Sequence, residues 1–112
     1  MPYTIDRQSL FIGPFTLTSD PTTSARISLS SFAGALLFVE SVTGAASQIT
    51  WHATKGFQET ATYPIRSAVS NNVFTGIEQG YAYAFPDEVF GAQFIVPVLD
   101  SDTAIVSVAL KG

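Results

Sequence analysis

Short segments of alternating apolar and polar residues constrain the fold of this chain more than any other feature. In residues 26–30 the apolar side chains Ile27 and Leu29 share one face, and residues 48–53 alternate in the same way around Trp51. An alternation of period two indicates a β-strand with one buried face. Turn residues interrupt the pattern at intervals of roughly 8 to 12 residues, a spacing typical of antiparallel sandwiches.

We therefore predict an all-β fold, an antiparallel β-sandwich or jelly roll of about eight or nine short strands. The expected strands cover residues 9–17, 26–30, 35–42, 48–53, 60–66, 73–74, 81–85, 94–99 and 104–110. The first is either two short strands or one bent edge strand, because Gly13 and Pro14 interrupt it. Pro64 restricts another to a sheet edge or a strand end. Residues 100–102 are expected to form a hairpin loop between the last two strands.

One short helical turn is expected near residues 86–90. Pro86 suits the first turn of a helix, where its missing N–H is not needed. Asp87 and Glu88 follow it, where the helix dipole favours acidic side chains, and Gly91 ends the segment.

Residues 35–42 are almost continuously apolar, and Gly34 and Gly44 bound them. A strand buried on both faces has this composition, and so does a fragment of a buried helix. The length of the run and the bordering glycines favour the strand. We therefore expect both faces of this segment to be covered.

The length of 112 residues predicts a single domain. Residues 13–112 are assigned to one β-sandwich. Residues 1–12 lack the turn residues that separate the later strands, and we assign them to an N-terminal arm outside the core.

Charge is scarce: 12% of residues are charged, and the net charge is −4. The five basic residues are spread along the chain, so we expect no nucleic-acid partner and no polybasic membrane patch. The absence of cysteine excludes disulfides and cysteine nucleophiles. The N-terminal residues show no signal-peptide pattern, and the apolar run of residues 33–39 is too short to span a bilayer, so we expect synthesis in the cytosol.

No constellation of residues predicts catalysis. His52 is the only histidine, and we expect an ordinary sheet or surface side chain because no nucleophile elbow accompanies it. Asp100 and Asp102 lack the rest of a calcium loop, and Asp87 and Glu88 are explained by the helix dipole. We therefore predict no catalytic, cofactor-binding or metal-binding residue, no cofactor and no enzymatic activity.

Glycines and aromatic side chains also favour structural roles. Residues 76–80 contain two glycines but no Lys-Ser/Thr pair follows them, so no phosphate loop is predicted. A stacking platform for sugars or bases needs exposed, coplanar rings, and the alternation instead favours core positions. The aromatic residues considered are Phe57, Tyr63, Phe74, Tyr81, Tyr83, Phe85, Phe90 and Phe94.

Five motifs follow one another in the second part of the chain. They are Ile-Thr-Trp-His-Ala at 49–53, Tyr-Pro-Ile at 63–65, Gly-Tyr-Ala-Tyr-Ala-Phe-Pro at 80–86, Val-Phe-Gly-Ala-Gln-Phe-Ile at 89–95 and Val-Ser-Val-Ala-Leu-Lys at 106–111. This outline, over rather more than half of the chain, resembles a family of small phage virion proteins encoded near capsid or tail genes. It also looks loosely like the discoidin and carbohydrate-binding jelly rolls.

The resemblance implies a viral structural protein, a decoration or cement protein that stabilises a bacteriophage head by binding the major capsid protein at the capsid surface. It implies a homo-oligomer, commonly a homotrimer, with an N-terminal arm that braces neighbouring subunits. Six residues form the hypothetical interface: Pro2, Tyr3, Ile5, Leu10, Phe11 and Phe15. The alternatives are a glycan-binding module and a tail or baseplate component of a virion.

Overall fold

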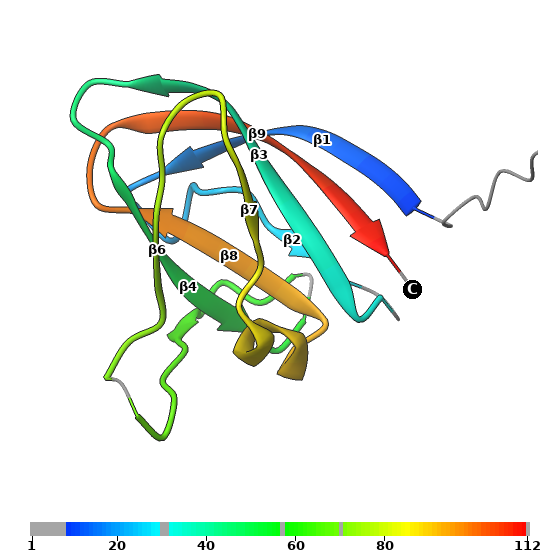
Figure 1. The fold of residues 1–112 in the computed structure, drawn as a ribbon. Helices are drawn as coiled ribbons and strands as arrows, with labels where there is room; N and C mark the ends of the chain where they lie inside the picture. Colours follow the sequence, from blue (N-terminus) through cyan, green and yellow to red (C-terminus); the bar gives the residue numbers. More distant parts are fainter. Residues whose placement is uncertain (1–8, 30–31, 57, 70, 112) are drawn as a thin grey trace, which may run out of the picture.

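The computed structural model describes residues 9–29, 32–56, 58–69 and 71–111, which form two facing antiparallel sheets (Figure 1). Sheet A has the order β1 (Ser9–Thr18), β9 (Thr103–Lys111), β3 (Gly34–Thr43) and β7 (Ala82–Ala84). Sheet B has the order β2 (Ile27–Ser28), β8 (Phe94–Leu99), β4 (Gln48–Thr54) and β5 (Tyr63–Pro64), with β6 (Phe74–Gly76) also paired to β4. None of the described residues forms a helix that could cross a membrane.

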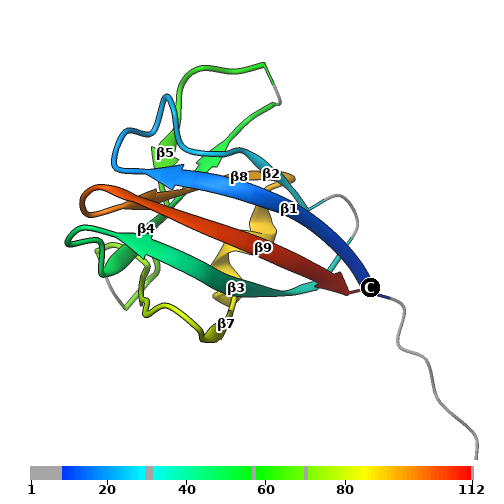
Figure 2. The same ribbon diagram turned by 90° about the horizontal axis from the view of Figure 1, so that it is seen from above.

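The order of the strands is that of a jelly roll, which confirms the predicted all-β sandwich. The first strand pairs with the last, and every connection outside β4, β5 and β6 passes from one sheet to the other. Figure 2 looks onto sheet A, where β9 lies between β1 and β3 and β8 lies behind them.

The elements β5 and β6 are two parts of one edge strand. The Ile65 N–H donates to the Trp51 carbonyl, and the Trp51 N–H donates to the Val73 carbonyl. Between Ile65 and Val73 the chain leaves the edge of the sheet. The Val73 N–H donates to the Ile65 carbonyl (3.2 Å), which joins the two ends of this segment. Pro64 lies at this edge, as predicted, where its missing N–H costs no ladder hydrogen bond.

The core lies between the sheets and is centred on Trp51, which is completely buried. Its ring packs on Phe85 with centroids 4.8 Å apart, and its Nε1–H donates to Thr75 Oγ1 (2.9 Å). Both Ile27 and Leu29 are buried on the inner face, as the alternation predicted. Burial of each such large side chain stabilises the fold by about 1.5–3 kcal/mol.

The strand β1 is one bent edge strand, the second of the two predicted alternatives. Its register with β9 shifts between Ile12 and Phe15. Gly13 makes the bend possible because its φ is +116° and an added Cβ would lie 3.3 Å from the Val106 carbonyl oxygen. Residues 9–12, which the sequence analysis assigned to an arm, pair with β9 and belong to the sheet. Residues 1–8 lie outside the described residues.

The predicted helical turn is present as η1 (Asp87–Gly91), a 3-10 helix preceded by Pro86. Both acidic residues lie in its first turn, and Val89 is completely buried. Val89 and Phe90, which packs against the core, anchor η1 at the end of the sandwich.

Two further expectations from the sequence are wrong. Residues 100–102 do not close a hairpin, because β8 belongs to sheet B and β9 to sheet A. They form an arch from one sheet to the other. The strand β3 is not covered on both faces either: Leu37 is completely buried, but its neighbour Leu36 is 43% exposed.

Asp100 and Asp102 tie this arch to the β3–β4 connection, which also crosses between the sheets. Asp100 accepts hydrogen bonds from Ser47 N–H (2.9 Å), Ser47 Oγ (2.7 Å) and Gln48 N–H (3.2 Å). Asp102 accepts from Ala45 N–H (2.8 Å). The hydrogen bonds from Ser47 lower the pKa of Asp100, because they stabilise the carboxylate. The two acids therefore stabilise the sandwich at one end.

Replacing Asp100 with Asn should lower the free energy of unfolding by about 1 kcal/mol at neutral pH, because the acceptor loses its charge. The folded-state pKa is below the unfolded value, so the stabilisation is present above the unfolded pKa and is lost as the pH falls through the folded pKa. Urea unfolding followed by Trp51 fluorescence, from about pH 7 down to about pH 2, measures both effects. Glu78→Gln, at an exposed site, is the control. If Asp100→Asn and wild type still differ in their free energy of unfolding at acid pH, the Asp100 carboxylate is not the cause.

Candidate interaction surface

The outer face of sheet A carries apolar side chains from all four strands. Residues directly opposite each other in antiparallel strands share a face, and Ala109 of β9 lies opposite both Phe11 of β1 and Leu36 of β3. The outward apolar residues are Phe11, Leu36, Phe38, Ala82, Ala84, Ile105 and Ala109. Together they form a largely apolar surface, interrupted by Ser107 opposite Phe38 and called here the outer A face.

Large side chains on the outer A face are solvent-exposed. Phe11 is 67% exposed, Leu36 43% and Ile105 41%. The rings of Phe11 and Phe38 are neighbours, with centroids 6.1 Å apart. Exposed apolar surface of this kind is a candidate binding surface.

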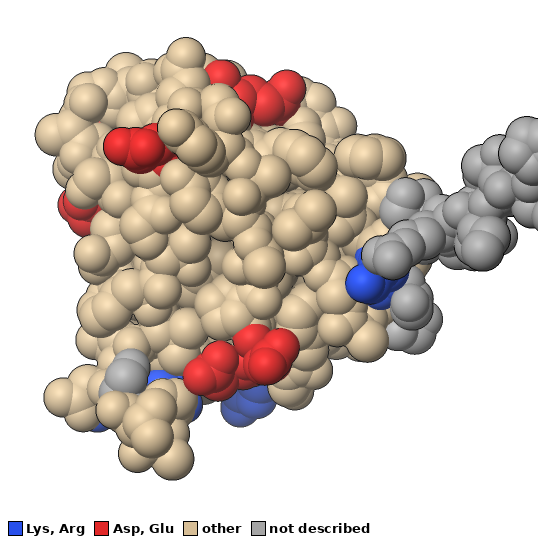
Figure 3. Space-filling view, in the orientation of Figure 1, with Lys and Arg blue, Asp and Glu red and all other residues tan. Residues whose placement is uncertain are grey.

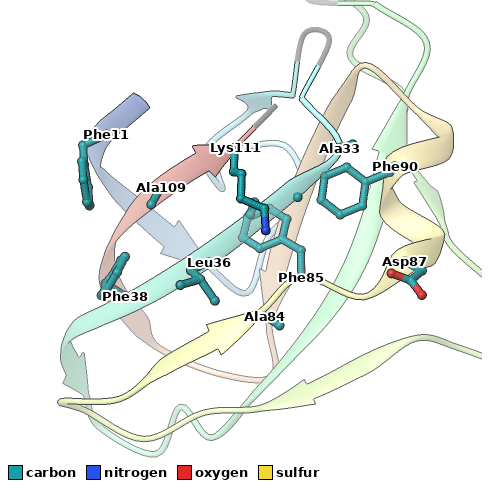
Figure 4. Close-up of a pocket in the computed structure, with 12 residues that line it drawn as sticks. Phe11, Ala33, Leu36, Phe38, Ala84, Phe85, Asp87, Phe90, Ala109 and Lys111 are labelled. Atoms are coloured by element: carbon teal, nitrogen blue, oxygen red, sulfur yellow. The ribbon is translucent and has the colours of Figure 1, made fainter. Parts of the chain in front are cut away.

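A groove of about 500 Å³ crosses the outer A face at the end where β1 begins and β9 ends. Small residues line much of it: Ala33, Gly34, Ala35, Ala84 and Ala109. In Figure 4, Phe11 and Phe38 lie at one end of the groove and Phe90 and Asp87 at the other, with Lys111 between them. Phe85, at the bottom of the groove, also touches Trp51 in the core.

Few charged groups accompany these apolar residues. Lys111 and Asp87 line the groove, and the Lys111 stem passes over Gly34, where an added Cβ would lie 3.4 Å from its Cε. Glu40 accepts a hydrogen bond from Ser107 Oγ (2.5 Å). Figure 3, in the orientation of Figure 1, shows a small number of acidic and basic groups on a mostly uncharged surface.

Sheet B is better covered. The β8 residues Val96 and Val98 point away from the core, opposite His52 and Thr50 of β4, yet they are 0% and 7% exposed. Phe74 of β6 and Tyr63 of β5 are exceptions, at 51% and 50% exposed. The outer A face is therefore the larger apolar surface that the described part of the chain leaves open.

The structure supports part of the hypothetical interface derived from the sequence. Phe11 lines the groove, and Leu10 is 48% exposed at the start of β1. Phe15 is half-buried and packs against the core. Pro2, Tyr3 and Ile5 lie outside the described residues.

Sequence reasoning missed the contributions of β3 and β9. Leu36 and Phe38 were expected to be buried, and Lys111 was assigned no role. The signal was present in the almost continuously apolar run of residues 35–42, which has more apolar residues than one core face can take.

His52 lies on β4, in sheet B, away from the groove. It is half-buried, and its Nδ1 lies 3.2 Å from Thr62 Oγ1. Burial lowers the pKa of its imidazole. The described residues contain no group of three or more His, Asp or Glu side chains placed to hold a metal ion.

The aromatic residues divide between core and surface. Phe85 is buried, while Tyr83 and Phe90 pack against the core, as expected. Tyr63, Phe74 and Tyr81 are at least half-exposed. Phe57 lies outside the described residues.

Comparisons with protein-family models, with curated proteins and with solved structures give no match for this chain.

The single histidine permits a direct check of its environment. The His52 imidazole should titrate below the usual value of about 6.5, because burial disfavours the protonated ring. Protonation then favours the unfolded chain, so stability should fall as the pH drops through the unfolded pKa. NMR titration of the ring protons measures the pKa, and His52→Gln should remove this pH dependence. A midpoint above the usual value would indicate an acidic partner.

Proposed function

We propose that this chain is a non-enzymatic structural protein of a virus particle, a decoration or cement protein that binds the major capsid protein at the capsid surface. The observation that carries the proposal is the outer A face, an open apolar surface on a jelly-roll sandwich. Jelly rolls recur in viral capsid domains, and apolar surfaces of this kind bind proteins. The phage-like motifs of residues 48–111 support the same assignment.

The low charge of the chain supports assembly through this surface. Charges buried in an interface without partners are costly, and the outer A face presents very few of them. The groove brings together phenylalanine, leucine and alanine side chains rather than a nucleophile and a base. His52 lies on the opposite sheet. This chemistry suits contact with another polypeptide better than a reaction.

A glycan-binding role receives less support. Tyr81 is 60% exposed beside Tyr83, but their ring planes are 45° apart. Tyr63 lies under the Lys55 ammonium instead, 5.8 Å from it. A sugar platform needs coplanar exposed rings, and these aromatics are tilted or dispersed. A tail or baseplate role would use the same outer A face, and the position in the particle distinguishes it.

Particles assembled from the genome that encodes this chain test the proposal. The chain should sediment with purified particles at a constant copy number, measured by quantitative mass spectrometry. Particles that lack it should lose their contents at a lower temperature, and added purified protein should restore their stability.

His52→Gln serves as the matched control, because a structural protein does not need an imidazole and the variant should restore stability fully. Absence of the chain from purified particles, or particles equally stable without it, would exclude the proposal. Labelling in electron micrographs then separates a head position from a tail position.

A further inference from the structure

We propose that the groove of the outer A face binds one short, extended segment of the partner protein, about five residues long and apolar in its middle. The segment carries one acidic side chain, which faces Lys111, and one basic side chain, which faces Asp87. This inference deepens the proposed function. It rests on that function for the identity of the partner, and it names the part of the partner that fills the groove.

The outer A face is too small for a broad interface between two domains. Its strands contain ten, nine, ten and three residues. At about 3.3 Å per residue and about 4.8 Å between strands, their flat area is roughly 500 Å², below the 800 Å² or so that a standard interface buries per partner. Binding energy is often concentrated in a few side chains that fill a pocket. A partner therefore gains most from a contact inside the groove.

The groove is open and rigid before anything binds. Ala35, Ala84 and Ala109 line it without filling it, and its volume is about 500 Å³, within the range of about 300–1,000 Å³ that is usual for ligand sites. Phe85 at its bottom packs on Trp51 in the core, with ring centroids 4.8 Å apart. Little ordering of the protein therefore opposes binding.

The direction of the groove sets the length of its occupant. Each strand of sheet A contributes to it in turn (Figure 4): Phe11 from β1, Ala109 from β9, Leu36 from β3 and Ala84 from β7. The groove therefore crosses the strands. Three strand spacings separate β1 from β7, or about 14 Å. Because an extended chain rises about 3.3 Å per residue, about five residues cross this distance.

The charges of the groove favour a peptide over a simple amphiphile. Lys111 ends β9 and Asp87 follows β7, so about two strand spacings, or about 10 Å, separate their backbones. An extended peptide covers about 10 Å in three to four residues, so one segment can present an acid to Lys111 and a base to Asp87. A fatty acid has a single negative charge and leaves Asp87 unmatched. Both groups are exposed, and such pairs fix orientation more than they add affinity.

A designed peptide tests the charges on the full-length protein. The acetylated and amidated pentapeptide Glu-Leu-Ala-Leu-Lys, when extended, directs both leucines to one side, toward the groove. It should shift the NMR signals of Leu36, Ala84 and Ala109, with a Kd of about 1 mM or tighter. Asp87→Lys should weaken its binding by about fivefold and should instead prefer Glu-Leu-Ala-Leu-Glu, because the variant replaces an anion with a cation. The peptide Glu-Ser-Gly-Ser-Lys, which has no apolar side chain, should not bind.

Two neighbouring alanines supply a matched pair of variants. Ala84 lines the groove, whereas Ala82 lies two residues earlier on the same strand and the same face, outside the groove. Ala84→Leu should fill the groove and weaken peptide binding by about tenfold or more. Ala82→Leu adds the same volume beside the groove and should stay within about threefold of wild type. Trp51 fluorescence verifies that both variants are folded.

Three results overturn the inference. The first is no shift of the groove signals at about 10 mM peptide, about ten times the weakest expected Kd. The second is an equal effect of Ala84→Leu and Ala82→Leu on peptide binding. The third is a different occupant: decanoate that shifts the groove signals when the peptide does not, or a dimer in sedimentation velocity that Ala84→Leu dissociates.

The same variants separate this inference from the proposed function. Added to particles that lack the chain, Ala82→Leu should restore their stability and Ala84→Leu should not. If both variants restore it as well as wild type does, the inference is excluded and the virion role stands. If the groove binds the peptide as expected but the chain is absent from purified particles, the virion role is excluded and the peptide specificity of the groove stands.

Discussion

The packing of Trp51 on Phe85 is the contact on which the sandwich and its surface both depend. Trp51 lies in the middle of sheet B, and Phe85 follows the short edge strand of sheet A, where its N–H donates to the Ala35 carbonyl. Their rings join the two sheets at 4.8 Å. Phe85 also lines the groove, so one side chain belongs both to the core and to the groove. The outer A face therefore rests on rigid, fully packed structure, which is what a preorganised binding surface requires.

Local pattern was enough to predict most of the strands. The alternation around Ile27 and Leu29 follows from a pleated strand with one buried face, and it survives in the structure. The 3-10 turn after Pro86 follows from steric and electrostatic preferences that act within a few residues. Both predictions succeed because their causes lie within the segment itself.

Long-range contacts explain what the sequence could not predict. Asp100 binds Ser47, 53 residues away, and only the crossing of two connections between the sheets brings them together. A hairpin and an arch use the same loop residues, so residues 100–102 alone could not distinguish them. The outer A face depends equally on distant pairings: Phe11, Ala109 and Leu36 become neighbours only when β9 enters between β1 and β3.

The apolar pattern of β3 correctly identifies side chains suited to burial, but it does not say what covers them. Leu36 has the apolar character of a side chain covered on its face, but one sandwich supplies only one cover. Under the proposed function, the second layer over this strand is the surface of the partner protein. The scarcity of charge then limits where that surface can approach, because each charged group it buries must find an opposite charge. The groove between Phe11 and Phe90 has one cation and one anion, so a partner proposed to dock there needs to supply only two opposite charges.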